Sequence, residues 1–260
     1  MHSIDDQAPY ATRVPAVLLL LILFAFSPCD ARAQMFSYGG DRPRSVQSVS
    51  FVYQLIEFTR DGEGQAGQTF DFSGPAYGLT YARPNVTASI VYGPESEDDT
   101  RDLRLLDATI ATWGEVVLSG SPTSDRLFLP IGLQSNYRRV APRGSENSLV
   151  DSFNLTVLAL GAGLGYTADL RESARFEIRA MPMIGIALRA FGESTGVSYL
   201  LDTDARLHLL EVAGRVGLSA GYAFRLQSWN VSGSDLLLGV QDDLFDYSSA
   251  QHVFTIGINW

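Results

Sequence analysis

A two-residue alternation of apolar and polar side chains, sustained over long segments, most constrains the fold of this chain. From Phe176 to Leu188 every even-numbered position is apolar or proline, whereas the odd-numbered positions include Glu177, Arg179 and Gly185. Side chains on a strand point alternately to opposite faces, so this period predicts β-strands with one apolar and one mixed face. No segment shows a convincing helical period. We therefore expect an all-β fold.

The same period marks nine segments of the chain. They lie at 46–58, 70–82, 85–93, 103–118, 126–140, 149–168, 174–191, 206–228 and 251–260. Many have ten or more residues, which exceeds the length usual in soluble sheets and matches the tilted span of a bilayer. Their apolar faces carry Tyr, Phe or Trp near the strand ends, where membrane proteins place aromatic girdles.

The segments between these strands alternate in length. The long ones are acidic and lie at 59–68, 94–102, 141–148 and 192–204. The short ones lie at 82–85, 119–125 and 169–173. Long connections on one side and short turns on the other are typical of barrels that span an outer membrane.

The first 33 residues are predicted to be a secretory signal peptide. Arg13 precedes the apolar run Val14–Phe26, and the small residues Ala31 and Ala33 follow, so cleavage is expected after Ala33. Cys29 lies in this leader, but Phe26-Ser27-Pro28 is a poor lipobox. The predicted organisation is a signal peptide, 1–33, followed by one β-barrel domain, 34–260.

The composition excludes some classes of protein. A formal net charge of −10 argues against a nucleic-acid partner, because phosphate binding needs a basic surface. After the leader, no apolar run approaches the roughly 18 residues of a transmembrane helix. The predicted mature chain has no cysteine, and an exported protein without disulfides needs another source of stability. A closed sheet provides one, because it satisfies every backbone group and has no edge.

The C-terminal segment Ala250–Trp260 ends on an aromatic residue within an alternating pattern. With the leader, the long strands and the alternating loop lengths, it makes residues 34–260 resemble the small bacterial outer-membrane β-barrel proteins. In that family the last strand is the signal read by the barrel-assembly machinery. The matching positions here are Phe254, Ile256, Ile258 and Trp260. The family pattern prefers a second aromatic residue where Ile258 stands.

The resemblance implies an antiparallel, up-and-down transmembrane β-barrel with both chain ends in the periplasm, and hence an even number of strands. A tenth strand is expected within 231–246; eight strands is the alternative. The resemblance also implies a monomer in the outer membrane of a Gram-negative-type bacterium. Its partners would be outer-membrane lipid, lipopolysaccharide and the barrel-assembly machinery.

Charges on the polar phase of the strands would point into this barrel. They are Asp107, Glu115, Glu177, Arg179, Arg189, Glu211 and Arg215. An isolated charge in such a place is costly, so we expect a buried network of ion pairs that plugs the barrel. The alternative is a narrow, water-filled pore whose charges bias ion passage. A barrel of eight to ten strands favours the plug.

The sequence gives little support for catalysis. His208 and His252 are predicted on the outward phase near strand ends. A lipid hydrolase embedded in a barrel would need a serine, a histidine and an acid together, and Ser248, Ser249 and Asp246 lie near His252 in the chain. Interfacial histidines are the favoured interpretation, and the chain is predicted not to be an enzyme.

No cofactor or metal site is predicted. The acidic residues Glu95, Glu97, Asp98 and Asp99 do not have the spacing of a calcium-binding loop, so they are expected to be solvated. The glycine-rich run Gly161–Gly165 lies within a strand and is expected to provide small inward-facing positions rather than a nucleotide site.

Three hypotheses for function follow. The first is a non-enzymatic outer-membrane protein with a structural or surface-interaction role through its acidic extracellular loops. The second is a small pore or a conduit for a hydrophobic solute. The third is a soluble, secreted, lipocalin-like barrel that binds an apolar ligand. The third requires the apolar phase to face inward, whereas the first two require it to face lipid.

Overall fold

The computed structural model describes residues 46–62, 70–94, 96, 103–120, 125–142, 153–171, 173–189, 195–231 and 245–260. Within these ranges the strands are β1 (Ser48–Gly62), β2 (Phe70–Arg83), β3 (Val86–Gly93), β4 (Leu103–Gly120), β5 (Arg126–Pro142), β6 (Phe153–Ala162), β7 (Leu164–Arg171), β8 (Ala174–Arg189), β9 (Thr195–Ala213), β10 (Val216–Val231) and β11 (Phe245–Asn259). No helix in the described ranges is long and apolar enough to cross a membrane. The predicted leader lies outside them.

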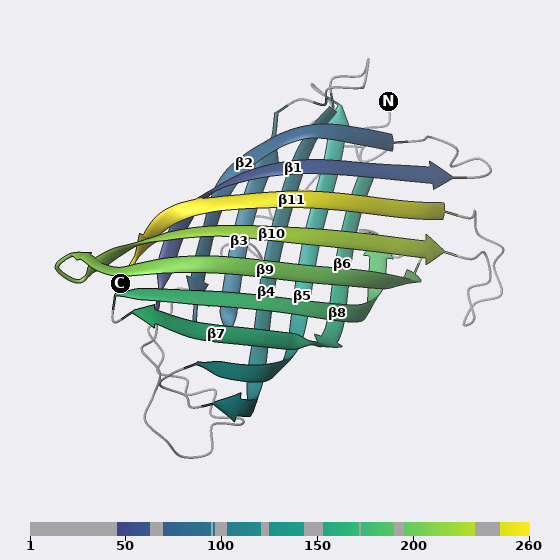
Figure 1. The fold of residues 1–260 in the computed structure, drawn as a ribbon. Coiled ribbons are helices and arrows are strands. Elements are labelled where there is room, and N and C mark those ends of the chain that lie inside the picture. The colour runs from purple at the N-terminus through teal and green to yellow at the C-terminus, as the bar shows by residue number, and fades with distance from the viewer. Residues whose placement is uncertain are drawn as a thin grey trace, which may run out of the picture. The chain divides into compact units, whose positions relative to one another are not determined.

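Consecutive strands pair antiparallel, except that β6 and β7 each pair with β5 and β8 and not with each other. Because β1 pairs with β11, the sheet closes into an up-and-down barrel (Figure 1). At the closure Gln47 and Trp260 exchange backbone hydrogen bonds of 3.1 and 3.0 Å. The barrel has ten strand positions, because β6 and β7 are two parts of one strand. The predicted all-β fold, barrel and strand number are confirmed.

Gly163 separates β6 from β7. Both parts lie between β5 and β8, and the Gly163 N–H donates to the Pro130 carbonyl at 3.0 Å. A Cβ at position 163 would collide with the backbone carbonyl of Ala180. Glycine therefore permits a local irregularity in a strand that the sequence predicts as continuous from 149 to 168.

The strands are staggered. Leu106 on β4 has a paired residue on the next strand, which has its own partner on the strand after that. This series of partners goes once around the barrel and reaches β4 again at a different residue, Ser119. A displacement of this kind requires the strands to tilt, typically by about 35–45° from the barrel axis. β3 is short, and its pairing with β4 ends at Thr112, so β4 continues to Gly120 beside β5 alone.

Short and long connections lie at opposite ends of the barrel. The end that holds Gln47 and Trp260 has short connections after β2, β4, β7 and β9. The connections after β1, β3, β5, β8 and β10 lie at the other end and include the ranges 63–69, 143–152 and 232–244 outside the described residues. We call the two ends the short-turn end and the long-loop end.

The tenth strand is not where the sequence placed it. The segment predicted as one strand, 206–228, is a hairpin of β9 and β10 with a turn at Gly214 and Arg215. β9 begins at Thr195, so most of the loop predicted at 192–204 is strand. The ten strand positions close without a strand in 231–246, of which 232–244 lie outside the described residues. A two-residue turn supported by the positive φ of Gly214, 66°, leaves no visible break in the apolar pattern.

Candidate functional site

The interior of the barrel is the candidate site, and it has two different halves. Toward the long-loop end the inward side chains form an apolar cluster in which Phe58 stacks on Phe72 at 5.8 Å and on Tyr247 at 5.9 Å between ring centroids. Trp229 lies 6.2 Å from Tyr247. Leu103 and Leu105 are fully buried in the same cluster. Toward the short-turn end the inward residues are mainly polar or charged.

Arg138 on β5 lies on the short-turn side of this apolar cluster and is 0% exposed. Its Nε donates to Asp107 Oδ2 on β4 at 2.8 Å. Its Nη1 donates to Ser249 Oγ at 3.1 Å and to the Tyr247 hydroxyl, both on β11. Since β5 and β11 lie on opposite sides of the barrel, this side chain crosses the lumen. The Asp107 carboxylate also accepts from Asn136 Nδ2 at 2.9 Å and from Thr109 Oγ1 at 3.3 Å.

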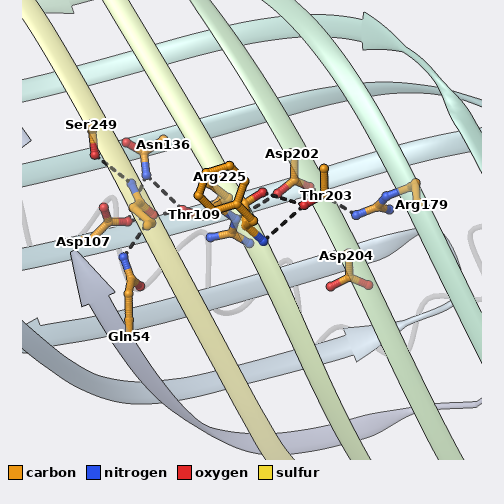
Figure 2. A network of polar contacts seen from close by, with 12 residues as sticks. Gln54, Asp107, Thr109, Asn136, Arg179, Asp202, Thr203, Asp204, Arg225 and Ser249 are labelled. Atoms are coloured by element: carbon orange, nitrogen blue, oxygen red, sulfur yellow. Dashed lines mark hydrogen bonds and ion pairs between the residues drawn. The ribbon is translucent and has the colours of Figure 1, made fainter. Parts of the chain in front are cut away.

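A second ion-pair group involves β8, β9 and β10. Asp202 accepts from Arg179 Nη2 at 3.3 Å and from Arg225 Nε at 2.9 Å. Figure 2 shows Asp202 between these two arginines. The Arg179 guanidinium lies 3.8 Å from the centroid of the Trp113 ring, a cation–π contact that reaches across to β4. Arg206 and Asp204 form a neighbouring pair at 2.9 Å.

A third group lies nearer the short-turn end. Arg126 pairs with Glu115 at 2.9 Å, and Arg175 pairs with Asp169 at 2.7 Å. Their carboxylates come from β4 and β7, so these pairs tie neighbouring strands together at the rim. The partners lie on the inward phase of their strands, in the half of the interior that is polar.

The inward charges of opposite sign balance. Among the side chains that the structure describes, the inward arginines are Arg126, Arg138, Arg175, Arg179, Arg206 and Arg225, and the inward carboxylates are Asp107, Glu115, Asp169, Glu177, Asp202 and Asp204. Each arginine has a carboxylate partner. The described part of the interior therefore carries no excess charge that would favour anions over cations.

A small polar cavity lies among these groups. Its volume is about 20 Å³, and its lining includes Gln54, Thr80, Asp204, Arg206 and Arg225. That volume holds about one water molecule with several polar partners. No group of three or more His, Cys, Asp or Glu side chains in the described ranges could hold a metal ion. The acidic residues at 97–99 lie outside those ranges.

The structure places four of the predicted interior charges, Asp107, Glu115, Glu177 and Arg179, inside the barrel. The side chain of Arg189 lies outside the described residues. Glu211 and Arg215 belong elsewhere: they lie at the β9–β10 turn with exposed side chains. The prediction for these two residues was wrong because the chain turns at this point. Residues at the rim of the barrel do not alternate between lumen and exterior.

His208 also points the other way from the prediction. It is buried inside the barrel, where Nδ1 lies 2.8 Å from Ser219 Oγ and Nε2 lies 4.0 Å from Glu177 Oε2. The outward phase of β9 is occupied by Leu207 and Leu209. The sequence pattern assigned His208 outward because the phase was read through the turn from β10. His252 does face outward, as predicted.

The Ser219–His208–Glu177 arrangement has the residue types of a hydrolase, and Gly217–Gly221 matches the G-x-S-x-G pattern, which the sequence analysis overlooked. The surroundings of Ser219 differ from those of the nucleophilic serine in hydrolases with this motif, which sits on a sharp strand-to-helix turn. Ser219 lies within β10, paired on both sides, and is 6% exposed. Asn259 Nδ2 donates to its Oγ at 2.9 Å. We interpret the group as interior packing.

The other predicted hydrolase residues do not come together. Ser249 faces inward and contacts Arg138, whereas Ser248 and His252 face outward. The side chain of Asp246 lies outside the described residues. His252 contacts Tyr222, at 2.9 Å between Nδ1 and the phenol oxygen.

The C-terminal residues lie on the outward face of β11. Phe254, Ile256, Ile258 and Trp260 are all exposed there. Their strand pairs with β1 on one side and β10 on the other. Their role as an assembly signal stays a prediction.

Several interior residues were missed by the sequence analysis. Asp202 and Asp204 fall in the segment predicted as loop 192–204, so their phase was not considered. Arg138 follows Gln134 and Asn136 on the polar phase of β5, and that signal alone identifies it as inward. Its contact with β11 has no signal in the sequence, because it joins residues 109 positions apart.

No family model matches the chain, and no curated protein sequence matches it. Solved structures with a similar arrangement include neisserial surface protein A (14% identity, 81% of this chain and 95% of that one, TM-score 0.29). Another is Ail of Yersinia pestis, in complex with the heparin analogue sucrose octasulfate (11%, 83% and 99%, 0.28). A third is the toluene transporter TodX of Pseudomonas putida (8%, 83% and 90%, 0.24). These are bacterial outer-membrane β-barrel proteins. The barrel architecture of the present chain rests on its own strand pairing.

Proposed function

We propose that the chain is a non-enzymatic outer-membrane β-barrel protein with a structural or surface-interaction role, carried by the loops at its long-loop end. The observation that supports this most is the orientation of the two strand faces. Large apolar side chains point away from the lumen and are exposed, for example Leu79, Leu160 and Ile256. Buried ion pairs fill the opposite face.

The outward apolar surface suits lipid and not water. It continues around the barrel, with exposed Phe51 on β1, Ile90 on β3, Ile131 on β5, Ile184 on β8 and Leu226 on β10. A soluble monomer rarely exposes a contiguous apolar area of more than a few hundred Å². A soluble, lipocalin-like barrel needs the apolar phase inside, so this orientation argues against that hypothesis.

The filled interior argues against a wide pore. Arg138 crosses the lumen below a packed apolar cluster, and the described polar cavity holds about one water molecule. A small pore or a hydrophobic-solute conduit would need these contacts to open. We therefore assign the role to the surface, where the long connections include the acidic segment at 94–102.

The first test is heat modifiability. The membrane fraction is run on a denaturing gel before and after boiling, and a closed barrel is expected to migrate as a compact band only in the unboiled sample. Recovery in the soluble periplasm without a band shift would contradict the proposal.

Conductance is the second test. The purified protein is added to planar bilayers, with a porin as positive control, and no steady conductance is expected from the paired interior. A stable open channel would favour the pore hypothesis over the structural one.

A further inference from the structure

A hydrogen-bonded polar pair lies on the outward, apolar face of the barrel. Tyr222 on β10 and His252 on β11 are both exposed, and the phenol oxygen lies 2.9 Å from Nδ1. Aromatic rings flank the pair: Phe224 is 5.1 Å from His252, and Phe254 is 5.3 Å from Tyr222, between centroids. If lipid surrounds this face, polar groups here need partners, because an unsatisfied donor in hydrocarbon is costly.

The hydrogen bond determines what the histidine can offer to its surroundings. When the Tyr222 O–H donates to Nδ1, the ring carries its proton on Nε2, which becomes an outward-facing donor. The reverse arrangement leaves the phenol proton unpaired and adds a bare acceptor at Nε2. The first arrangement therefore leaves fewer polar groups unsatisfied. Among the described residues Nε2 of His252 has no hydrogen-bond partner, so it is available to an acceptor from outside them.

The position of the pair along the strands indicates which acceptor is at hand. On β11 the outward positions from His252 toward the short-turn end are Phe254 and Ile256. Those toward the long-loop end are Ala250 and Ser248. Ser248 is opposite Ser228 on β10. On β1 the exposed side chain of Glu57 also faces outward, and it lies opposite Ala250.

His252 thus lies one outward position, about 7 Å along the strand, from the level of Glu57 and two outward positions from Ser248 and Ser228, whereas Leu226 beside Ala250 is still apolar. In a bilayer the ester or amide carbonyls that link acyl chains to the headgroup lie just beneath the charged groups.

We propose that His252, oriented by Tyr222, is a lipid-binding site whose Nε2–H donates to an acyl-linkage carbonyl oxygen of a membrane lipid. The proposal rests on the proposed function, since it requires this face to contact lipid. The flanking rings of Phe224 and Phe254 provide an apolar surface for the adjoining acyl chain.

The test is a competition between two lipids that differ only in the carbonyl. The barrel is reconstituted in vesicles of equal parts diester and diether phosphatidylcholine, one of them deuterated. Native mass spectrometry then measures the ratio of retained ester to ether lipid. For the unsubstituted protein we expect an excess of ester lipid of about twofold to tenfold, the effect of one net hydrogen bond. His252→Phe keeps a ring of similar size and should bring the ratio to about one.

Two further variants sharpen the result. Tyr222→Phe should lower the ratio, because the histidine loses the group that orients it. Tyr199→Phe removes a hydroxyl from an exposed outward tyrosine on β9 and should leave the ratio unchanged. An equal ratio in the unsubstituted protein and His252→Phe would overturn the lipid site. So would a dimer in the spectrum that disappears in His252→Phe, which would assign the pair to a contact between two copies.

Failure of the lipid site is distinguishable from failure of the proposed function. Each sample is also tested for the heat-dependent band shift after reconstitution. If no variant inserts and shifts, the membrane assignment itself fails. If all insert and shift but show no ester preference, only the lipid site fails.

Discussion

Arg138 on β5 and Tyr247 on β11 meet across the lumen, although four strand positions separate β5 from β11 in either direction around the barrel. The same arginine is paired with Asp107 on the adjacent strand. One side chain therefore links opposite walls of the barrel directly. This contact makes the interior a packed structure at that level.

Replacing Arg138 should destabilise the barrel strongly. Arg138→Leu leaves Asp107 buried without its cation, which typically costs about 3–5 kcal/mol. The free energy of unfolding in urea, followed by loss of the compact gel band in lipid vesicles, measures this loss. The double variant with Asp107→Leu removes both charges and should recover at least about 2 kcal/mol. Equal losses in the single and double variants would contradict a buried ion pair.

The contact between Arg179 and Trp113 should contribute through the aromatic face. Trp113→Phe keeps a ring under the guanidinium, whereas Trp113→Leu removes it at comparable size. We expect the leucine variant to be less stable than the phenylalanine variant by about 1–2 kcal/mol. Combining each with Arg179→Met should abolish that difference. A difference that persists without the arginine would assign it to packing alone.

Gly163 should not tolerate a side chain. In Gly163→Ala the new Cβ would collide with the Ala180 carbonyl, so β8 or the β6–β7 junction must move. The expected loss is about 1–3 kcal/mol, measured as a lower midpoint of the heat-dependent band shift. Gly214→Asn is the matched control: position 214 has φ 66° and open space around a Cβ, and asparagine accepts this conformation. Equal effects at the two positions would show that the collision is relieved without cost.

Trp260 should matter for assembly more than its exposure suggests. Trp260→Ser is expected to lower the amount of assembled barrel in the outer membrane several-fold, whereas Trp260→Phe should not. Phe51→Ser is the control, since Phe51 is an outward aromatic residue of the same exposure, 48%. Quantitative immunoblotting of the unboiled band compares the variants. Equal loss in Trp260→Ser and Phe51→Ser would point to lipid contact, not to a terminal signal.

The barrel could be predicted because the pattern that specifies it lies within each strand. A strand that separates lipid from a packed lumen must alternate, so the two-residue period of β5, β8 and β11 is visible residue by residue. The β9–β10 hairpin was missed for a physical reason. Gly214 and Arg215 turn the chain in two residues, and apolar positions continue on both sides, so the pattern has no gap.

The interior contacts were less predictable because they depend on register and curvature. The Asp107–Arg138 pair requires knowing that these residues lie opposite each other on β4 and β5. The contact with Tyr247 requires the closed barrel, since it joins opposite walls. The inward orientation of His208 was not predicted, because it depends on the position of the β9–β10 turn. A sequence shows which residues face the lumen, but the partners follow from the stagger of the strands.

Among the described residues, β3 is much shorter than its neighbours β2 and β4. Its eight residues, at about 3.3 Å each and inclined by about 40°, rise only about 20 Å, less than the roughly 25 Å apolar band of such barrels. On the proposed membrane assignment, the bilayer beside Val86–Gly93 would thin to match β3, whereas lipids on the opposite side would keep their full length. Such a barrel would impose an uneven thickness on its membrane, which would give neighbouring proteins and lipids a preferred side of approach.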